Sequence, residues 1–251
     1  MTLQAKQFLL SAELLREKVP SFSAYPFSLP AIRELKKIEF HPKVTFIIGE
    51  NGTGKSTLLE AIAVAWGFNP EGGSKNFNFS TRSSHSTLHE HIRLAKTYRR
   101  PKDGFFLRAE SFFNVATNIE QLDAEPGLSP PIIDSFGGRS LHEQSHGESF
   151  LTLLTKRFRK EGLYILDEPE AALSPTRQMA ALRSIHELVK EGSQFIIATH
   201  SPILMAYPDA QILLIDEGEM RAVAYTETEH FSVAKSFLNN HQKMIAELLS
   251  D

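Results

Sequence analysis

A glycine-rich loop constrains the fold of this chain more than any other stretch. The loop fits the phosphate-binding pattern G-x-x-x-x-G-K-[ST], and one further residue that follows the pattern is counted with it. Its residues are Gly49, Glu50, Asn51, Gly52, Thr53, Gly54, Lys55, Ser56 and Thr57. The glycines let successive N–H groups point into one concave anion site, and the positive end of a following helix adds to that site. The pattern therefore predicts that the chain binds a nucleoside triphosphate.

The segments on either side of this phosphate loop have the composition that the pattern needs. Val44 to Ile48 is an apolar run typical of a buried strand. Leu58 to Trp66 has the amphipathic pattern of a helix that stops at Gly67. Between these elements, Lys55 would reach the β- and γ-phosphates, and the Ser56 hydroxyl would ligate Mg²⁺.

Composition limits the classes of protein that the chain can be. The chain has 27 Lys and Arg against 30 Asp and Glu in 251 residues, which gives a net charge of −3. This balance is typical neither of a protein that coats nucleic acid nor of a protein that binds to a membrane surface. The chain has no cysteine, which excludes disulfides and thiolate metal sites and fits a reducing compartment. No apolar run approaches membrane-spanning length, and the residues from Leu9 to Arg16 do not resemble a signal peptide. We expect a soluble, cytoplasmic protein.

The C-terminal half alternates apolar strands with a helix. Leu163 to Leu166 reads as a buried strand that delivers Asp167 and Glu168, and Phe195 to Ala198 reads as a second strand followed by His200. Between them, Ser174 and Pro175 supply an N-cap and first turn for a helix that ends at Gly192. Fully apolar strands alternating with helices predict a parallel sheet covered on both faces, with the chemistry at the carboxyl ends of its strands.

The remaining segments are less regular. Residues 69–86 and 123–140 are rich in turn formers and read as loops. Between them we predict a basic helix over His89 to Arg100 and a strand over Phe105 to Arg108. The stretch from Ile212 to Ala224 reads as a closing hairpin. The sequence contains no heptad array, so we expect no long coiled-coil arm.

Adjacent carboxylates at the end of a strand serve two tasks in ATP hydrolysis. Asp167 would hold Mg²⁺, directly or through water. Glu168 would polarise the attacking water as a general base. The alternative is an ordinary polar strand end, which the phosphate loop upstream makes the weaker interpretation.

Together these residues resemble the ATP-binding-cassette (ABC) type ATPases, and specifically small stand-alone predicted ATPases with features of the SMC-like group. The resemblance covers Val44 to Ile215. It implies an α/β P-loop NTPase fold with a mostly parallel sheet core, flanking helices, N-terminal antiparallel strands and a helical subdomain inserted between the phosphate loop and Asp167. It implies one domain over residues 1–251, with a core over 20–68 and 161–225, a largely helical lobe over 69–160 and a C-terminal helix over 230–250.

The same resemblance implies roles for individual residues. The phosphate loop is similar to the Walker A motif, and Leu163 to Glu168 is similar to Walker B with its catalytic glutamate. Lys55 and His200 would contact the γ-phosphate, His200 as the switch histidine of the family. ATP and Mg²⁺, held by Ser56 and Asp167, are the implied cofactors. Residues 172–174 stand where the family has its D-loop.

The segment Gln144-Ser145-His146-Gly147-Glu148, here called the signature segment, lies where the family carries L-S-G-G-Q. Ser145, Gly147, Glu148 and the start of the following helix would cap the γ-phosphate bound by a second subunit, which implies an ATP-dependent homodimer. Gln144 and His146 depart from the family pattern. Glu148 in place of Gln is similar to SMC-like members.

Two features of the family have no obvious counterpart. The Q-loop lacks a Gln, and Glu110 or Ser111 holds the nearest position. The aromatic residue that stacks on adenine is Tyr25 or Phe27, although a core or surface role fits either of them as well.

A competing motif overlaps the signature segment. His142-Glu143-Gln144-Ser145-His146 matches H-E-x-x-H, the pattern of zinc metallopeptidases. That chemistry needs one continuous helix with His142 and His146 on the same face. Nearby glycines, Gly147 among them, are a poor frame for such a helix, and the two interpretations exclude each other geometrically.

Two local basic clusters offer a binding surface or a solvated face. A binding surface of this kind would hold a nucleic acid or an acidic partner. The balanced net charge of the chain favours the solvated face. The clusters comprise Arg82, His85, His89, His91, Arg93, Lys96, Arg99, Arg100 and Lys102, and Lys156, Arg157, Arg159 and Lys160.

For the biological role, the sequence leaves several classes open. The preferred one is a mechanical or switch ATPase of nucleic-acid maintenance or defence, with DNA or a protein as its partner. The alternative is the ATP-binding subunit of an ABC transporter, which requires a membrane permease as partner. A nucleotide sensor with very slow hydrolysis is a third class.

Overall fold

The computed structural model describes residues 6–74, 86–109, 112–124 and 131–250. Its strands are β1 (Leu9–Leu14), β2 (Lys37–Glu39), β3 (Val44–Gly49), β4 (Ile92–Lys96), β5 (Asp103–Arg108), β6 (Gly162–Asp167), β7 (Gln194–Ala198), β8 (Gln211–Asp216) and β9 (Glu219–Val223). Its α-helices are α1 (Pro30–Arg33), α2 (Lys55–Trp66), α3 (Phe112–Ala124), α4 (His146–Thr152), α5 (Pro175–Lys190), α6 (Pro202–Met205) and α7 (Glu229–Leu248). None of the described helices is long and apolar enough to cross a membrane.

The central sheet has six strands in the order β5-β6-β7-β3-β8-β9. Neighbouring strands run parallel except β9, which closes the edge antiparallel to β8. A separate three-stranded antiparallel sheet has the order β2-β1-β4. The predicted parallel core and N-terminal antiparallel strands are therefore confirmed. Because β6, β7 and β3 are consecutive, the residues after each of these strands come to one edge of the sheet.

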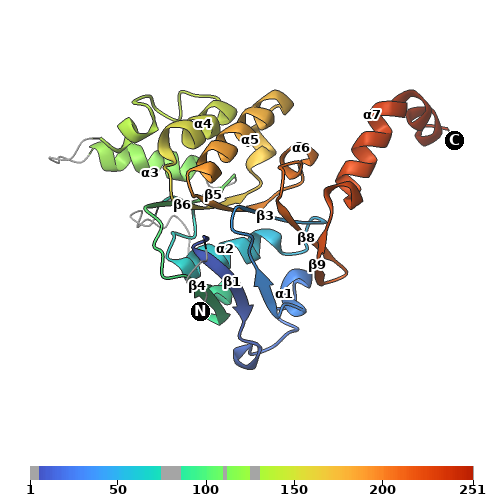
Figure 1. Cartoon of the computed structure of the whole chain (residues 1–251), viewed down its shortest axis with the longest axis horizontal. Helices are drawn as coiled ribbons and strands as arrows, with labels where there is room; N and C mark the ends of the chain where they lie inside the picture. Colours follow the sequence, from blue (N-terminus) through green and yellow to red (C-terminus); the bar gives the residue numbers. More distant parts are fainter. Residues whose placement is uncertain (1–5, 75–85, 110–111, 125–130, 251) are drawn as a thin grey trace.

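Helices cover both faces of the central sheet, with α3, α4 and α5 on one side and α2 on the other (Figure 1). Alternation along β3 reflects this arrangement. Phe46 packs in the core under α3, α4 and α5, whereas Ile47 packs in the core with α2 and the antiparallel sheet. All residues of β3 are buried, as the apolar run from Val44 predicts.

The prediction of a helix over His89 to Arg100 is wrong. A 3-10 turn (Thr87–His91) leads instead into β4, which pairs antiparallel with β1. Ile92 is buried and Arg93 exposed, a period-two alternation that suits a sheet with one solvated face. Pairing with β1, a segment distant in sequence, overrides the local helical preference.

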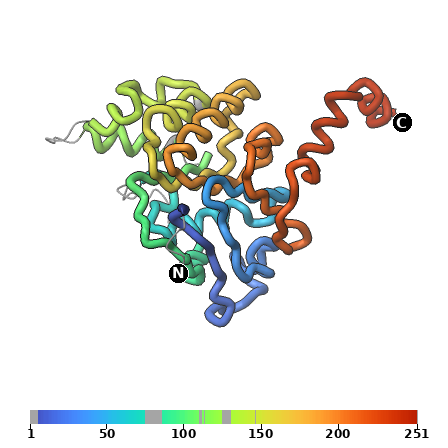
Figure 2. The backbone as a smooth tube through the Cα atoms, viewed as in Figure 1, coloured from blue at the N-terminus to red at the C-terminus, as the bar shows by residue number. Residues whose placement is uncertain are grey.

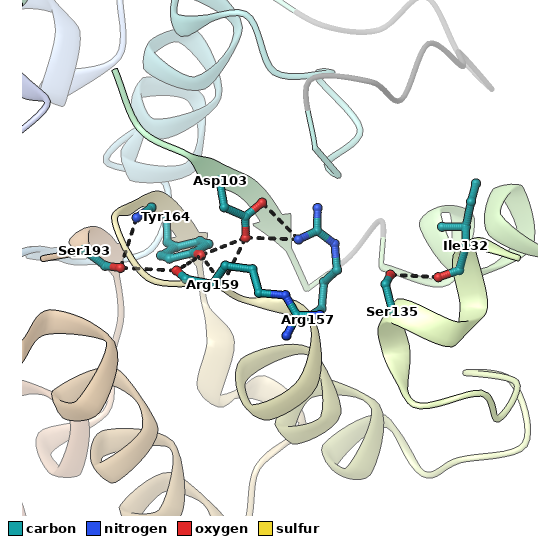
Figure 3. A network of polar contacts seen from close by, with 8 residues as sticks. Asp103, Ile132, Ser135, Arg157, Arg159, Tyr164 and Ser193 are labelled. Atoms are coloured by element: carbon teal, nitrogen blue, oxygen red, sulfur yellow. Dashed lines mark hydrogen bonds and ion pairs between the residues drawn. The ribbon is translucent and has the colours of Figure 1, made fainter. Parts of the chain in front are cut away.

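A buried polar network anchors the end of the α4 segment to the sheet (Figure 3). After α4 the chain forms a π-helical turn (Leu153–Arg157), and Arg157 then donates to both carboxylate oxygens of Asp103 at 2.9 and 3.0 Å. The fully buried Tyr164 hydroxyl lies 2.9 Å from Asp103 Oδ2 and 2.6 Å from the carbonyl oxygen of Arg159. Burial raises the pKa of Tyr164, so its phenol stays protonated.

Replacing Tyr164 by Phe is expected to lower the free energy of unfolding by about 1–3 kcal/mol, because the hydroxyl that accepts the Arg159 N–H and lies beside Asp103 Oδ2 is lost. Urea denaturation measures this loss. The control is Tyr98→Phe, since Tyr98 is 71% exposed and should be neutral. Equal denaturation midpoints for the two variants would show that the network contributes nothing to stability.

Helix α7 leaves the body of the molecule and extends away from it (Figure 2). It contains no buried residue and has a kink at Asn240, and it packs against α6 and the 3-10 turn Tyr225–Glu227. Its first turn reaches the edge of the sheet where the phosphate loop lies, through Glu229 and His230.

Candidate active site

The phosphate loop connects β3 to α2 with its lysine folded back on it. Lys55 is buried, and its Nζ donates to the carbonyl oxygens of Gly49 and Glu50, at 2.7 Å each. Gly49 has a φ of +151°, and a Cβ there would lie 2.7 Å from the carbonyl oxygen of Ile215, so only glycine fits. Burial lowers the pKa of Lys55, against the nearby carboxylates of Glu168, Asp167 and Glu170.

Ser56 and Asp167 meet although they are far apart in sequence. The Ser56 hydroxyl donates to Asp167 Oδ1 at 3.0 Å, and Asp167 is 6% exposed at the end of β6. Arg108 of β5 lies beside them, with its Nε 3.9 Å from Asp167 Oδ2 and its other end paired with the buried Glu60 at 2.5 Å. A hydroxyl and a carboxylate side by side are the oxygen donors that Mg²⁺ takes in phosphate sites, so the residues present fit this ion.

Glu168 projects from the same edge of the sheet. Its φ and ψ are 50° and 51°, a left-handed conformation that is uncommon for a residue with a side chain. The backbone N–H of Glu168 donates to the carbonyl oxygen of Ala198, which holds this turn against β7. The carboxylate is half-exposed, and its Oε1 lies 3.9 Å from His200 Nε2. Such strain is typical of functional sites.

His200 follows β7 and is held from two sides. Its backbone N–H donates to Glu170 Oε1 at 2.5 Å, and its ring Nδ1 lies 3.3 Å from Nε2 of His230 on α7. Burial, and then the charge of Lys55, lowers the pKa of His200. Burial raises the pKa of Glu170, although the His200 N–H opposes this shift. A neutral imidazole therefore faces the Glu168 carboxylate at pH 7.

A cavity of 1120 Å³ opens beside the phosphate loop. Residues of the loop, the switch position and the first turn of α7 line it, among them Gly49, Asn51, Thr53, His200 and His230. A cavity of about this volume is on the order of the pockets that hold small-molecule ligands and cofactors in proteins.

The signature segment forms a helix start, as its family position implies. Ser145 is the N-cap of α4, and it makes a capping box with Glu148 in which each side chain accepts the other's backbone N–H. The pKa of Glu148 is lowered, first by the Ser145 N–H. Arg177 of α5 donates to Ser145 Oγ at 3.1 Å and Glu148 Oε1 at 3.4 Å. In the described residues the side chains of Ser145 and Glu148 thus contact each other's backbone and Arg177, not the phosphate loop.

Gly147 is fixed by close packing. A Cβ on it would lie 2.6 Å from both the carbonyl oxygen of Ala172 and an Arg177 nitrogen. We expect Gly147→Ala to lower ATP turnover by about tenfold, because overpacking costs of order 1–3 kcal/mol and shifts the start of α4. The measurement is steady-state turnover, with Thr155→Ala, an exposed site on the following turn, as control. Equal turnover in both variants would show that this packing is irrelevant to activity.

The zinc-peptidase hypothesis is wrong on geometry. Residues Leu141 to Gln144 form a turn and α4 begins at His146, so His142 and His146 do not share a helix. His142 Nε2 instead lies 3.2 Å from Thr117 Oγ1. The described residues contain no group of at least three side chains that could hold a metal ion.

Other sequence-based candidates have mixed outcomes. Glu110 and Ser111, the candidates for the Q-loop, lie outside the described residues. Phe27 is 3% exposed and its ring packs on His91, so it is not available to stack on adenine. Tyr25 is 67% exposed and stays the candidate.

The basic clusters are partly tied up within the chain. Arg93 pairs with Glu13 at 2.7 Å, Lys96 lies 4.4 Å from the centre of the Trp66 ring, and Arg157 pairs with Asp103. These partners fit the structural role of the clusters better than a free binding face. Arg82 and His85 lie outside the described residues.

Sequence reasoning missed several residues at this edge. Arg108, Glu170 and Arg177 position Asp167, His200 and the signature segment respectively. Glu170 had a local signal, since it follows the carboxylate pair by two residues. Arg177 and His230 had none, because their contacts join segments that no motif links.

Two family models match the chain in succession. One, described as "AAA domain", matches residues 23–125, and the other, described as "AAA domain, putative AbiEii toxin, Type IV TA system", matches residues 137–206.

Curated relatives are ABC transporter proteins. An uncharacterized ABC transporter ATP-binding protein of Haemophilus influenzae is 27% identical over 70% of this chain and 70% of its own length. The hemin import ATP-binding protein of Aliivibrio fischeri is 24% identical over 72% of this chain and 73% of its own length.

Solved structures show the same fold. A nucleotide-free ATP-binding cassette from an ABC transporter matches with a TM-score of 0.51 and 19% identity. The match covers 98% of this chain and 100% of that one. Another cassette of an ABC transporter has a TM-score of 0.53 and 18% identity, covering 94% of this chain and 97% of that one. With the site described above, the family models and the curated relatives support an ABC-type P-loop ATPase, an enzyme that binds and hydrolyses ATP.

Proposed function

We propose that this chain is a Mg²⁺-dependent ATPase whose two copies enclose ATP between them. The observation that carries the proposal is the contact of Ser56 with Asp167 beside Lys55, since it joins a metal site to a phosphate site. Lys55 neutralises phosphate charge, Ser56 and Asp167 hold the Mg²⁺, and Glu168 takes the proton of the attacking water. When bound, Mg²⁺ would supply neutralisation of the charge that develops on the phosphates.

The second copy would complete each site. The side chains of Ser145 and Glu148 are oriented by Arg177 within their own subunit, which leaves the start of α4 as a preformed surface. Backbone N–H groups at such a start favour phosphate oxygens. We place Ser145, Gly147 and Glu148 of one copy over the γ-phosphate on the phosphate loop of the other, which includes Asn51 and Thr57.

A shared site makes turnover depend on association. Specific ATPase activity should rise with protein concentration and level off when the dimer is saturated, whereas activity per chain of a monomeric enzyme is independent of concentration. Full specific activity at high dilution would contradict the shared site and leave a single-chain ATPase.

For the work that hydrolysis drives, we propose a switch or mechanical ATPase of nucleic-acid maintenance or defence. The model matched over residues 137–206, whose description names a toxin system, supports defence. Glu148 within the signature segment is similar to SMC-like members. The lack of cysteine fits a cytoplasmic location.

The specific second candidate is a transporter's ATP-binding subunit, which the names of the curated relatives favour. Stimulation of ATP turnover by double-stranded DNA, lost at high salt because phosphate contacts are screened, would support the first role. Co-purification of a membrane permease, with turnover insensitive to DNA, would support the transporter role and overturn the first.

A further inference from the structure

The first turn of α7 enters the cavity next to the switch histidine with two residues, Glu229 and His230. The rings of His200 and His230 lie with their centroids 5.5 Å apart, and Nδ1 of His200 is 3.3 Å from Nε2 of His230. Both side chains line the cavity beside the phosphate loop. Their other ring nitrogens, His200 Nε2 and His230 Nδ1, are buried and make no hydrogen bond.

The pair can share only one proton along the line between the rings. A neutral imidazole has one N–H donor and one bare nitrogen acceptor, so one ring must donate and the other accept. Burial lowers the pKa of both His200 and His230, which keeps each ring neutral at pH 7. The direction of donation therefore fixes which nitrogen of His200 carries its proton.

The surroundings of His200 decide that direction. Its Nε2 faces Glu168 Oε1 at 3.9 Å, and a carboxylate only accepts. A proton on Nε2 suits this neighbour, and it is also the proton that could donate to a phosphate oxygen. His200 Nδ1 is then the acceptor, and His230 Nε2–H is its donor.

We propose that His230 is a positioning residue, which donates to His200 Nδ1 and so holds the switch histidine with its Nε2–H aimed at the γ-phosphate. This inference rests on the proposed function of His200. It assigns His230 no contact with ATP of its own. A histidine that is oriented by a second group through its other nitrogen follows a general design of catalytic and metal-binding histidines.

Turnover of His230 variants tests the assignment. His230→Phe keeps a ring and loses the donor, so kcat should fall by about tenfold, as when outer partners of metal-bound histidines are removed, with little change in KM for ATP. His230→Gln keeps an N–H donor and should restore most of kcat. The control is His241→Ala, which changes an exposed histidine of the same helix. Wild-type kcat in His230→Phe, or equal kcat in the Phe and Gln variants, would overturn the proposal.

A double-mutant cycle separates this proposal from that for His200. If His230 acts through His200, His230→Phe should have no further effect in a His200→Ala background, since coupled residues are not additive. Losses that multiply would overturn the positioning role. Unchanged turnover in His200→Ala alone would instead overturn the switch role of His200, whatever the His230 variants do.

Discussion

Replacing Glu168 by Gln is expected to lower ATP turnover by about 10²- to 10⁴-fold while ATP still binds. A general base contributes that range, and Gln cannot take a proton from the attacking water. The amide keeps the size of the side chain, and the Glu168 backbone N–H bond to Ala198 is unaffected. The phosphate and metal contacts of Lys55, Ser56 and Asp167 stay in place, so the affinity for ATP should change little.

Two measurements check this result: phosphate release under saturating ATP and ATP affinity by equilibrium binding. Glu143→Gln is the matched control, because Glu143 has an exposed side chain in the turn before α4. It should leave both quantities unchanged. Undiminished turnover in Glu168→Gln would place the base elsewhere, and Glu170, which accepts the His200 N–H, would be the next carboxylate to test.

Replacing Lys55 by Met should weaken ATP binding by about 100-fold and abolish turnover at cellular ATP. Hydrogen bonds to charged groups contribute about 1.5–3 kcal/mol each, and Lys55 is positioned to make such bonds to two phosphates. Nζ now donates to Gly49 and Glu50 carbonyl oxygens, so ATP would draw it from them toward the phosphates. Met keeps the apolar stem up to Cε and removes the ammonium group, with its charge and its N–H donors.

The control for Lys55→Met is Lys36→Met, because Lys36 is exposed, directly precedes β2 and does not line the cavity beside the phosphate loop. Binding by fluorescent ATP competition and unfolding by urea should be measured together. Weak binding with normal stability would support the role of Lys55. Wild-type affinity in Lys55→Met would contradict a phosphate site at this loop.

The regular core of the fold could be predicted from local pattern. Apolar runs such as Val44 to Ile48 and Phe195 to Ala198 are buried on both faces, so they read as strands without any knowledge of their partners. The N-cap and closing glycine of α5 are also local signals, and Ser174 does cap that helix. The strand β4 could not be predicted in this way, because its place is set by pairing with β1.

The candidate site divides along the same line. Lys55, Asp167 and His200 belong to motifs whose residue types and spacing indicate a function, so they could be predicted from the sequence alone. The structure adds what joins the motifs: the Ser56 hydroxyl on Asp167 and the His230 ring on His200. Such contacts depend on strand order and on where α7 starts, and neither leaves a periodic trace in the sequence.

The most direct test of the central claim is the molar mass of Glu168→Gln in solution with and without ATP. Light scattering should give the mass of one chain without nucleotide and of two chains with saturating ATP and Mg²⁺. The same variant carrying Gly147→Ala should dimerise more weakly, because the start of α4 is displaced. A one-chain mass at saturating ATP would contradict the shared site, since the signature segment would then have no nucleotide to cap.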